Sequence, residues 1–329
     1  MKTLYFNIKQ IVNPSLTSDM NTLSLIDNAA ICVENEKIVE VGDSDTLVQK
    51  YAEAEKMDVK GKLVFPGFVD PHTHPVFWKT REEEFEMRLQ GRSYEEIAAA
   101  GGGIRNSVRA LRTASEDELF DVSLERTKKF LEYGTTTIEA KSGYGLSFED
   151  EMKSLRVIKR MNEALPLDLI PTFLGAHEIP DEYRDDKETY IKIIIEEMIP
   201  YVAEHKLAKY CDVFCEKDVF ELEETERILE AGKKYGLIPR FHADELYPLG
   251  GAELAAKVGA VSADHLLQVS DAGILAMKDA GVTPTILPGT AFFIRKPNYA
   301  PARKMIDAGC EVALATDFNP GSCYTQNIQ

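Results

Sequence analysis

His72 and His74 are the residues whose type and spacing most directly indicate chemistry. They end an apolar, β-rich run over residues 63–74, LVFPGFVDPHTH. In an extended segment alternate side chains point the same way, so both imidazoles can reach one metal ion. Paired imidazoles at a strand end pack poorly and bind metals well. The pattern therefore predicts a metal site, with an exposed turn that carries incidental histidines as the alternative.

Other polar residues follow apolar runs further along the chain. Five of the six histidines end such runs, and the exception, His205, lies in a helical stretch. The residues that follow expected strands are His72, His74, Tyr144, His177, Glu216, His242, Glu245, His265, Asp317 and Asn319. In a parallel barrel these strand ends meet on one face, where active sites lie.

Three imidazoles and one carboxylate suit a divalent metal such as zinc or iron. We therefore choose as ligands of one metal ion His72, His74, His242 and Asp317. Taken singly, His242 is equally well explained as a core histidine and Asp317 as a helix cap. Their combination with the histidine pair favours the metal site.

The elements that must position these residues alternate along the chain. Short apolar runs predict strands over 64–70, 135–140, 167–173, 211–215, 237–242, 260–264, 282–286 and 311–315. Amphipathic stretches predict helices over 118–132, 149–162, 188–204 and 222–234. We therefore expect a TIM-like (β/α)8 barrel over residues 63–329. The long connection from 71 to 134 is expected to form extra helices that shape the pocket.

Residues 1–62 differ, because they carry strand patterns without helices between them. Residues 29–42 predict two strands joined by a turn at Asn35 and Glu36. We expect a small N-terminal β-sandwich domain before the barrel. Two domains also agree with a length of 329 residues.

The composition excludes some partners. A net charge of −17 repels phosphate backbones, so we expect no nucleic acid partner, and an anionic substrate needs a local cation. The sequence has neither a signal peptide nor ~18 uninterrupted apolar residues, so we expect a cytoplasmic protein without a membrane span. Cys211 and Cys215 are interpreted as core thiols, with zinc ligation as the alternative.

Several of these segments together resemble the amidohydrolase superfamily and, within it, the imidazolonepropionase family. The resemblance runs over essentially the whole chain. It is carried by FPGFVDPHTH at 65–74, TIEAKSGYG at 137–145, FLGAHE at 173–178, FHADE at 241–245 and ATDFNPGS at 315–322. It implies hydrolytic ring opening of 4-imidazolone-5-propanoate to N-formimino-L-glutamate by a metal-activated water.

The resemblance also implies roles for residues. Glu245 is expected to shuttle a proton, His265 to stabilise the developing oxyanion, and Asp317 to hold metal and water. The substrate contacts that it implies are Arg81, Tyr144, His177, Glu245, Asn319, Gly321 and Ser322, with Tyr94 as a further candidate. The guanidinium of Arg81 would bind the propanoate carboxylate. Alternatively, Arg81 pairs with a neighbouring glutamate, and Tyr144 is a turn residue between glycines.

Four points remain beyond the assigned residue roles: the number of metal ions, the extent of the chain, the rival functions and the assembly. Two-metal members of the superfamily carry a carboxylated lysine after the fourth strand. Here Lys217 stands there beside Glu216, and we favour one metal. Family members continue beyond the last residue here, so we expect a truncated chain that lacks the final barrel helix and the return strands. The rival functions are a purine or pyrimidine deaminase and an inactive metal-binding remnant. A homodimer is one option for its assembly.

Overall fold

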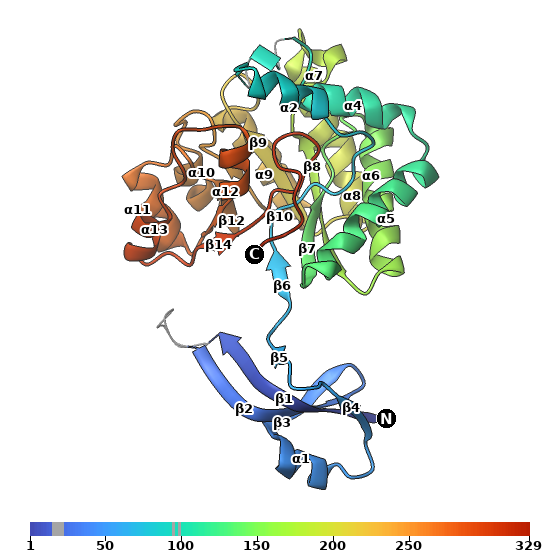
Figure 1. The fold of residues 1–329 in the computed structure, drawn as a ribbon. Coiled ribbons are helices and arrows are strands. Elements are labelled where there is room, and N and C mark those ends of the chain that lie inside the picture. The colour runs from blue at the N-terminus through green and yellow to red at the C-terminus, as the bar shows by residue number, and fades with distance from the viewer. Residues whose placement is uncertain (15–22, 94–95, 98–99) are drawn as a thin grey trace. The chain divides into compact units, whose positions relative to one another are not determined.

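The computed structural model describes residues 1–14, 23–93, 96–97 and 100–329. It divides into two compact units, Met1–Gly67 and Phe68–Gln329. Figure 1 shows the N-terminal unit in blue and the barrel unit in colours from light blue to red. Tyr94, a candidate substrate contact, lies outside the described residues.

The N-terminal unit is a five-stranded sheet with one helix. Its elements are β1 (Lys2–Pro14), β2 (Leu23–Glu34), β3 (Lys37–Asp43), α1 (Ser44–Lys50), β4 (Glu55–Asp58) and β5 (Leu63–Val64). The strand order is β3-β2-β1-β4, and β5 also pairs with β1. The predicted hairpin between β2 and β3 is confirmed. Its turn residues Asn35 and Glu36 have φ of 50° and 63°, the left-handed values that match the twist of paired strands.

The described residues of the barrel unit form eight parallel strands that follow one another in the order of the chain, which confirms the predicted fold class. They are β6 (Phe68–Asp70), β7 (Thr135–Lys141), β8 (Asp168–Ala176), β9 (Tyr210–Cys215), β11 (His242–Ala243), β12 (Ser262–His265), β13 (Thr283–Ile286) and β14 (Ala313–Leu314). A further short strand, β10 (Ile238–Pro239), pairs with β9. Buried side chains such as Ile138, Phe173 and Val213 fill the core between strands and helices.

Two of the predicted strands are divided. The run 64–70 is split between β5, which pairs with β1, and β6, which pairs with β7. Pro66 separates them, because proline cannot donate a ladder hydrogen bond. The run 237–242 is divided into β10 and β11, with Pro239 at the break.

The first and last strand ends meet and close the barrel near its carboxyl-terminal face. Thr73 and Phe318 form a parallel bridge. The amide of Asp317 donates to the carbonyl of His72 at 3.0 Å, and the amide of His74 donates to that of Phe318 at 2.8 Å. Two predicted ligand segments are therefore paired through the backbone.

Helices surround the strands, with α5, α6 and α8 on one side in Figure 1 and α10 to α13 on the other. The long connection contains α2 (Glu82–Leu89) and α4 (Ile104–Thr113) and continues into α5 (Glu116–Glu132). The later helices are α6 (Phe148–Ala164), α7 (Lys187–Ile193), α8 (Ile199–Glu204), α9 (Leu222–Lys234), α10 (Gly251–Val258), α11 (Asp271–Ala280), α12 (Pro288–Phe293) and α13 (Ala302–Asp307). The helix predicted over 188–204 contains a π-helical turn, η2 (Ile194–Met198), just before Pro200, which lacks the amide that a regular helix needs.

Local signals explain where helices begin. Ser115 and Glu118 form a capping box at the start of α5, and Ser147 accepts a hydrogen bond from the amide of Asp150 at the start of α6. Ser93 and Glu96 exchange the same pair of bonds as the capping box. Across the described residues, no helix has the length and apolar character needed to cross a bilayer.

Candidate metal centre

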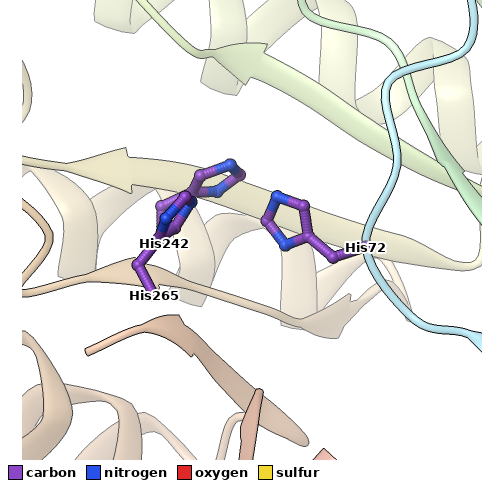
Figure 2. A group of neighbouring side chains, drawn as sticks. All are labelled: His72, His242 and His265. Atoms are coloured by element: carbon purple, nitrogen blue, oxygen red, sulfur yellow. The ribbon is translucent and has the colours of Figure 1, made fainter. Parts of the chain in front are cut away.

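Buried imidazoles from separate strands face one another at the carboxyl-terminal face of the barrel. Figure 2 shows His72, which follows β6, opposite His242 of β11 and His265 of β12. The ring centroid of His72 lies 4.6 Å from that of His242 and 5.3 Å from that of His265. Each of the three residues is at most 3% exposed. Bringing unprotonated nitrogens together in this way is costly unless a cation or proton lies between them.

The four predicted ligands lie close together. The Nε2 atoms of His72 and His74 are 3.3 Å apart, and Oδ1 of Asp317 lies 3.4 Å from each. Asp317 thus forms one group of potential metal ligands with these two histidines, whose donor atoms lie within 4.8 Å of one another. His242 shares a second such group with His72 and His265, and a third with His74 and His177.

Unpaired buried nitrogens provide a test of whether this donor set fits a metal. Nε2 of His242 is buried with no hydrogen-bond partner, whereas its Nδ1 lies 3.0 Å from Oδ1 of Asp212. Nδ1 of His265 and Nδ1 of His74 are also buried and unpaired. Leaving a polar atom unsatisfied costs about 1–3 kcal/mol. A cation that accepts the lone pair of His242 would remove this cost, so the residues present fit a metal.

The charges around His72 favour a cation. Burial and the positive charge of Lys141 lower the pKa of this imidazole, but its contacts with Asp264 and Asp317 outweigh them and raise the pKa to about 9. Its Nδ1 lies 2.6 Å from Oδ2 of Asp264. Without a bound metal, a proton on His72 would therefore compensate the two carboxylates. The negative charges of Asp264 and Asp317 would likewise stabilise a metal cation at this position.

The other ligand candidates are in the protonation states that a metal needs. Burial lowers the pKa of His74 and takes that of His242 well below its usual value, so both are neutral at pH 7. Burial raises the pKa of Asp317, but hydrogen bonds with His72 and His74 outweigh it and hold the pKa well below its usual value. Neutral imidazoles and an ionised carboxylate are the forms that bind metals.

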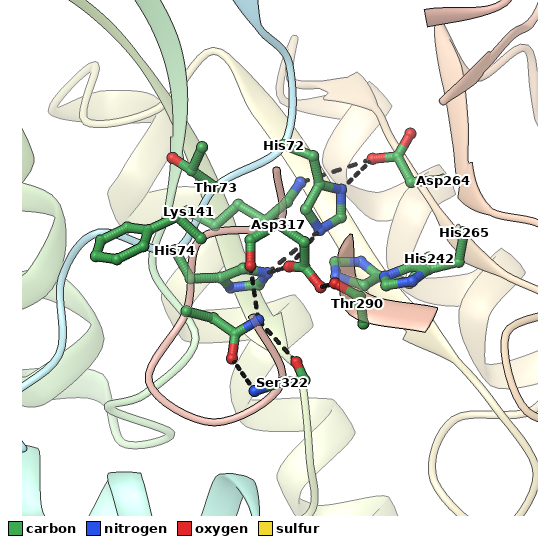
Figure 3. A network of polar contacts seen from close by, with 12 residues as sticks. His72, Thr73, His74, Lys141, His242, Asp264, His265, Thr290, Asp317 and Ser322 are labelled. Atoms are coloured by element: carbon green, nitrogen blue, oxygen red, sulfur yellow. Dashed lines mark hydrogen bonds and ion pairs between the residues drawn. The ribbon is translucent and has the colours of Figure 1, made fainter. Parts of the chain in front are cut away.

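Thr290 of α12 and the loop after β14 together fix Asp317. The hydroxyl of Thr290 donates to its Oδ2 at 2.7 Å. The side-chain amide of Asn319 donates to the carbonyl of Asp317 and to the hydroxyl of Ser322, both at 2.7 Å. The oxygen of the same amide accepts from the backbone of Gly321 and Ser322. Figure 3 shows this network. Asn319, predicted as a substrate contact, therefore uses its amide to shape the loop.

A small pocket opens onto these residues, and most of the predicted substrate contacts line it. Its lining residues are His74, Arg81, Ile104, Tyr144, His177, Phe214, His242, Glu245, His265, Asn319, Asp317 and Ser322. Gly321 is not among them, but it packs against the guanidinium of Arg81. Ile104 and Phe214 form an apolar part of the pocket wall, and neither was predicted from the sequence as a site residue. Phe214 precedes the end of β9, which is a usable signal, whereas nothing in the local sequence marks Ile104.

Arg81 is buried, with 6% of its surface exposed. Its Nη1 lies 3.6 Å from a carboxylate oxygen of Glu84, so the predicted helical pair exists but at a distance beyond a hydrogen bond. Its Nε is buried without a partner. The guanidinium packs directly on Gly321, where an added Cβ would lie 2.0 Å from Cζ of Arg81. A buried cation with spare donors can bind an anion.

Tyr144 and His177 lie side by side in the pocket, with ring centroids 5.2 Å apart. Nδ1 of His177 lies 2.8 Å from the carbonyl oxygen of Gly143, which leaves Nε2 available to a ligand. Gly143 has a φ of 106°, and a Cβ there would lie 2.9 Å from that ring. Glycine is therefore required where the loop approaches the imidazole.

Glu245 and His265 form the remaining polar pair in the pocket. Oε2 of Glu245 lies 3.6 Å from Nδ1 of His265, which is close but not a hydrogen bond. Burial raises the pKa of Glu245. His265 has a φ of 76°, a left-handed backbone that persists only where surrounding structure enforces it. The two side chains are thus placed to exchange protons with a ligand.

Glu216 and the residues around it take no part in these donor groups. Its carboxylate accepts hydrogen bonds from the amides of Lys217 and Leu246, both at 2.8 Å. Lys217 places its ammonium 4.9 Å from the ring centroid of Tyr247. Within the described ranges, no group of potential ligands includes Glu216 or a cysteine, and all five cysteines are buried free thiols.

Charged residues behind the histidines are the main feature that the sequence interpretation missed. Glu139, Lys141, Asp212, Arg240 and Asp264 are all buried. Each lies within or beside a strand of the barrel. That position is itself a signal, because charged side chains are almost never fully buried unless they are paired.

Comparisons with known proteins agree with this geometry. The model of the amidohydrolase family matches residues 63–328. The imidazolonepropionase of Geobacillus kaustophilus (strain HTA426) is 51% identical over 319 residues, which are 96% of this chain and 75% of that protein. The imidazolonepropionase of Clostridium tetani (strain Massachusetts / E88) is 52% identical over 312 residues, which cover 94% of this chain and 74% of that protein.

Solved structures with similar folds are more distant in sequence. A guanine deaminase from C. acetobutylicum with bound guanine has a TM-score of 0.70 at 16% identity, covering 100% of this chain and 77% of that one. A triazine hydrolase variant has a TM-score of 0.73 at 14% identity, and the match covers 99% of this chain and 73% of that one. At these identities the likeness concerns the fold alone.

Proposed function

The chain belongs to the amidohydrolase family and, within it, to the imidazolonepropionases, and we propose that its pocket opens the ring of 4-imidazolone-5-propanoate by hydrolysis. One observation carries the proposal. The pocket combines the neutral imidazoles of His74 and His242 and the ionised carboxylate of Asp317 with a buried arginine that has spare donors. This combination suits a metal-assisted reaction on a small anion.

The metal that we propose is a single zinc or iron ion. Its ligands would be His72, His74, His242 and Asp317, whose donor atoms form overlapping groups. When bound there, such an ion supplies Lewis acidity that makes water nucleophilic at neutral pH.

Arg81 is proposed to bind the propanoate carboxylate of the substrate. A guanidinium offers two parallel donors to a carboxylate, and burial strengthens the pair. Tyr144, His177 and Ser322 would contact the ring and its carbonyl from the pocket wall. Phe214 offers an apolar surface to the ring.

The chemical step requires one proton to move from water to the ring nitrogen. Asp317 orients the attacking water by accepting a hydrogen bond, and ionised Glu245 takes a proton from it. The water oxygen bonds to the ring carbonyl carbon, while His265 donates a hydrogen bond to the oxygen that becomes negative. Glu245 then gives its proton to the ring nitrogen as the C–N bond breaks, which leaves a formimino group and a carboxylic acid. The remaining water proton passes from this acid to solvent, which gives the carboxylate.

We further propose that the protein acts in the cytoplasm. All five cysteines are buried free thiols, which suits a reducing compartment.

The proposed function is tested by assaying the zinc-loaded protein for loss of imidazolone absorbance, beside guanine as the substrate of a rival deaminase. We expect turnover of imidazolonepropanoate and no ammonia from guanine. Arg81→Met should raise KM by about 100-fold or more, because the substrate carboxylate loses a charge-assisted pair of about 3 kcal/mol. Bound zinc without turnover of imidazolonepropanoate would refute the proposal and favour the inactive remnant.

A further inference from the structure

Behind the candidate ligands lies a charged layer that the proposed reaction does not use. It consists of Glu139, Lys141, Asp212, Arg240 and Asp264, none more than 5% exposed. Burying ions is costly, and a buried ion pair is by itself weak evidence for stability. The detailed contacts of the charged layer indicate a more specific role.

The first contact chain runs from Lys141 to His242. The ammonium of Lys141 donates to Oδ2 of Asp212 at 2.6 Å. The other oxygen of the same carboxylate, Oδ1, lies 3.0 Å from Nδ1 of His242. Because Nδ1 faces an acceptor, it carries the proton and leaves Nε2 with its lone pair. That Nε2 is the buried atom that lacks a partner.

The second contact chain runs from Arg240 to His72. Nη2 of Arg240 lies 3.2 Å from Oδ2 of Asp264, and that oxygen lies 2.6 Å from Nδ1 of His72. The same Nη2 donates to the carbonyl of Pro71 at 2.7 Å, so it also holds the backbone directly before the histidine. Nε2 of His72 is thereby turned toward Asp317, 3.4 Å away.

Glu139 joins the two chains. Its Oε1 accepts from Lys141 at 2.7 Å and lies 3.9 Å from Nη1 of Arg240. Its Oε2 accepts from the amide of Thr73, the residue between the paired histidines, at 3.3 Å. Figure 3 shows Lys141 and Asp264 beside His72 in this network. The charged layer therefore contacts two of the segments that supply ligands, the one that carries His72 and His74 and the strand that carries His242.

We infer that Lys141 and Arg240 are positioning residues of the metal centre: each holds a carboxylate that sets the tautomer and ring orientation of one ligand histidine. Lys141 acts through Asp212 on His242, and Arg240 acts through Asp264 on His72. The inference rests on the proposed ligand set. Mutation of partners that fix a ligand's tautomer in this way typically lowers metal affinity about 10- to 100-fold.

The test measures the zinc affinity of the full chain by competition with a chelator. Lys141→Met keeps the length of the side chain but removes its charge, and we expect a loss of zinc affinity of about 10- to 100-fold. Activity should return at saturating zinc with KM unchanged, because the pocket wall is intact. The thermal midpoint of the metal-free protein is recorded beside it, to separate loss of affinity from loss of fold.

Lys153→Met is the matched control. Lys153 is a largely buried lysine, with its side chain 11% exposed and its ammonium 2.7 Å from Oδ1 of Asp150, outside the charged layer. We expect it to lower thermal stability and leave zinc affinity unchanged. If Lys141→Met does not fold, Asp212→Asn keeps the shape of the side chain and should show the same loss of zinc affinity.

Two outcomes would overturn the inference. One is wild-type zinc affinity in folded Lys141→Met or Asp212→Asn. The other is a loss of affinity in Lys153→Met as large as in Lys141→Met. Because this readout uses zinc alone, it is independent of the substrate. If zinc affinity falls as expected but imidazolonepropanoate is not turned over, the proposed reaction fails while the inference stands.

Discussion

At the scale of single residues, the environment of each carboxylate decides its role. Asp317 is ionised because two imidazoles lie 3.4 Å from its Oδ1. Nδ1 of His265 lies 3.6 Å from Glu245, beyond a hydrogen bond, and burial outweighs the nearby positive charges and raises the pKa of Glu245. Glu216 accepts hydrogen bonds from the backbone, yet burial still raises its pKa to about 7. These acids lie on one face of the barrel but are suited to different roles: Asp317 to metal ligation, Glu245 to proton transfer, and Glu216 to holding a loop.

Glu245→Gln should abolish proton transfer while leaving binding in place. We expect kcat to fall by about 10²- to 10⁴-fold with little change in KM. Because the ionised form takes the proton, wild-type activity should decline as the pH falls through the raised pKa of Glu245, so the acid limb lies above pH 4.5. A pH–rate profile of the zinc-loaded protein checks both statements. An acid limb at or below pH 4.5 would contradict the role given to Glu245.

Glu216→Gln should change how stability depends on pH. The pKa of the folded protein, about 7, exceeds the ordinary value of 4.5, so the folded state binds this proton more tightly. Its contribution to stability is therefore complete below pH 4.5 and is lost as the pH rises through 7. We expect the free energy of unfolding, measured in guanidinium, to fall less from pH 5 to pH 8 in the variant than in the wild type. Equal losses would show that Glu216 titrates normally.

At the scale of elements, loops after the strands present the pocket residues, and close backbone contacts hold those loops. The buried carboxylate of Glu151, in α6, accepts hydrogen bonds from the amides of Gly143, Gly145 and Leu146. It thereby fixes the turn that carries Tyr144. The loop after β14 is held by Asn319 in the same manner, and its Gly321 forms the surface on which Arg81 packs.

Gly321→Ala should move Arg81. The added methyl would lie 2.0 Å from Cζ of Arg81, so the guanidinium must shift. We expect KM for imidazolonepropanoate to rise by about 10-fold or more, with kcat changed less, because the lost interaction is with the carboxylate rather than the reacting atoms. Gly42→Ala is the control, since its Cβ meets nothing closer than 3.8 Å. An unchanged KM in Gly321→Ala would argue against Arg81 as the anion contact.

At the scale of the whole chain, the metal centre joins distant segments of the barrel unit. The ligand candidates follow the first strand, belong to the fifth, and follow the last. Backbone pairing of Thr73 with Phe318 already closes the barrel at that seam. A metal shared by His72 and Asp317 would add a second link across the seam, so that metal binding and folding of the barrel unit are coupled.

Zinc should therefore raise the thermal midpoint of the protein in proportion to the logarithm of its concentration. At free zinc about 100 times its Kd, the added stability is about 2.7 kcal/mol, which corresponds to roughly 5–10 °C for a unit of this size. Differential scanning calorimetry over a zinc series measures the shift. His242→Asn should reduce it. A midpoint that does not respond to zinc would contradict a link across the seam.

The sequence alone was sufficient to predict where most of the barrel strands lie and which polar residues stand at their ends. Short apolar runs, amphipathic stretches and the turn at Asn35 depend on neighbouring residues, so they predicted strands, helices and the hairpin well. The division of the run 64–70 at Pro66 was missed, because its two halves pair with different strands, β1 and β7.

The imidazole pair also predicted a metal site from local spacing alone. Only the tertiary structure decided which groups from distant segments meet behind and around this metal site. The contacts of Lys141 with Asp212, of Asp264 with His72, and of Gly321 with Arg81 join segments far apart in the chain. Local patterns carry no information on such contacts, because their geometry depends on how the strands close and how side chains pack across the barrel.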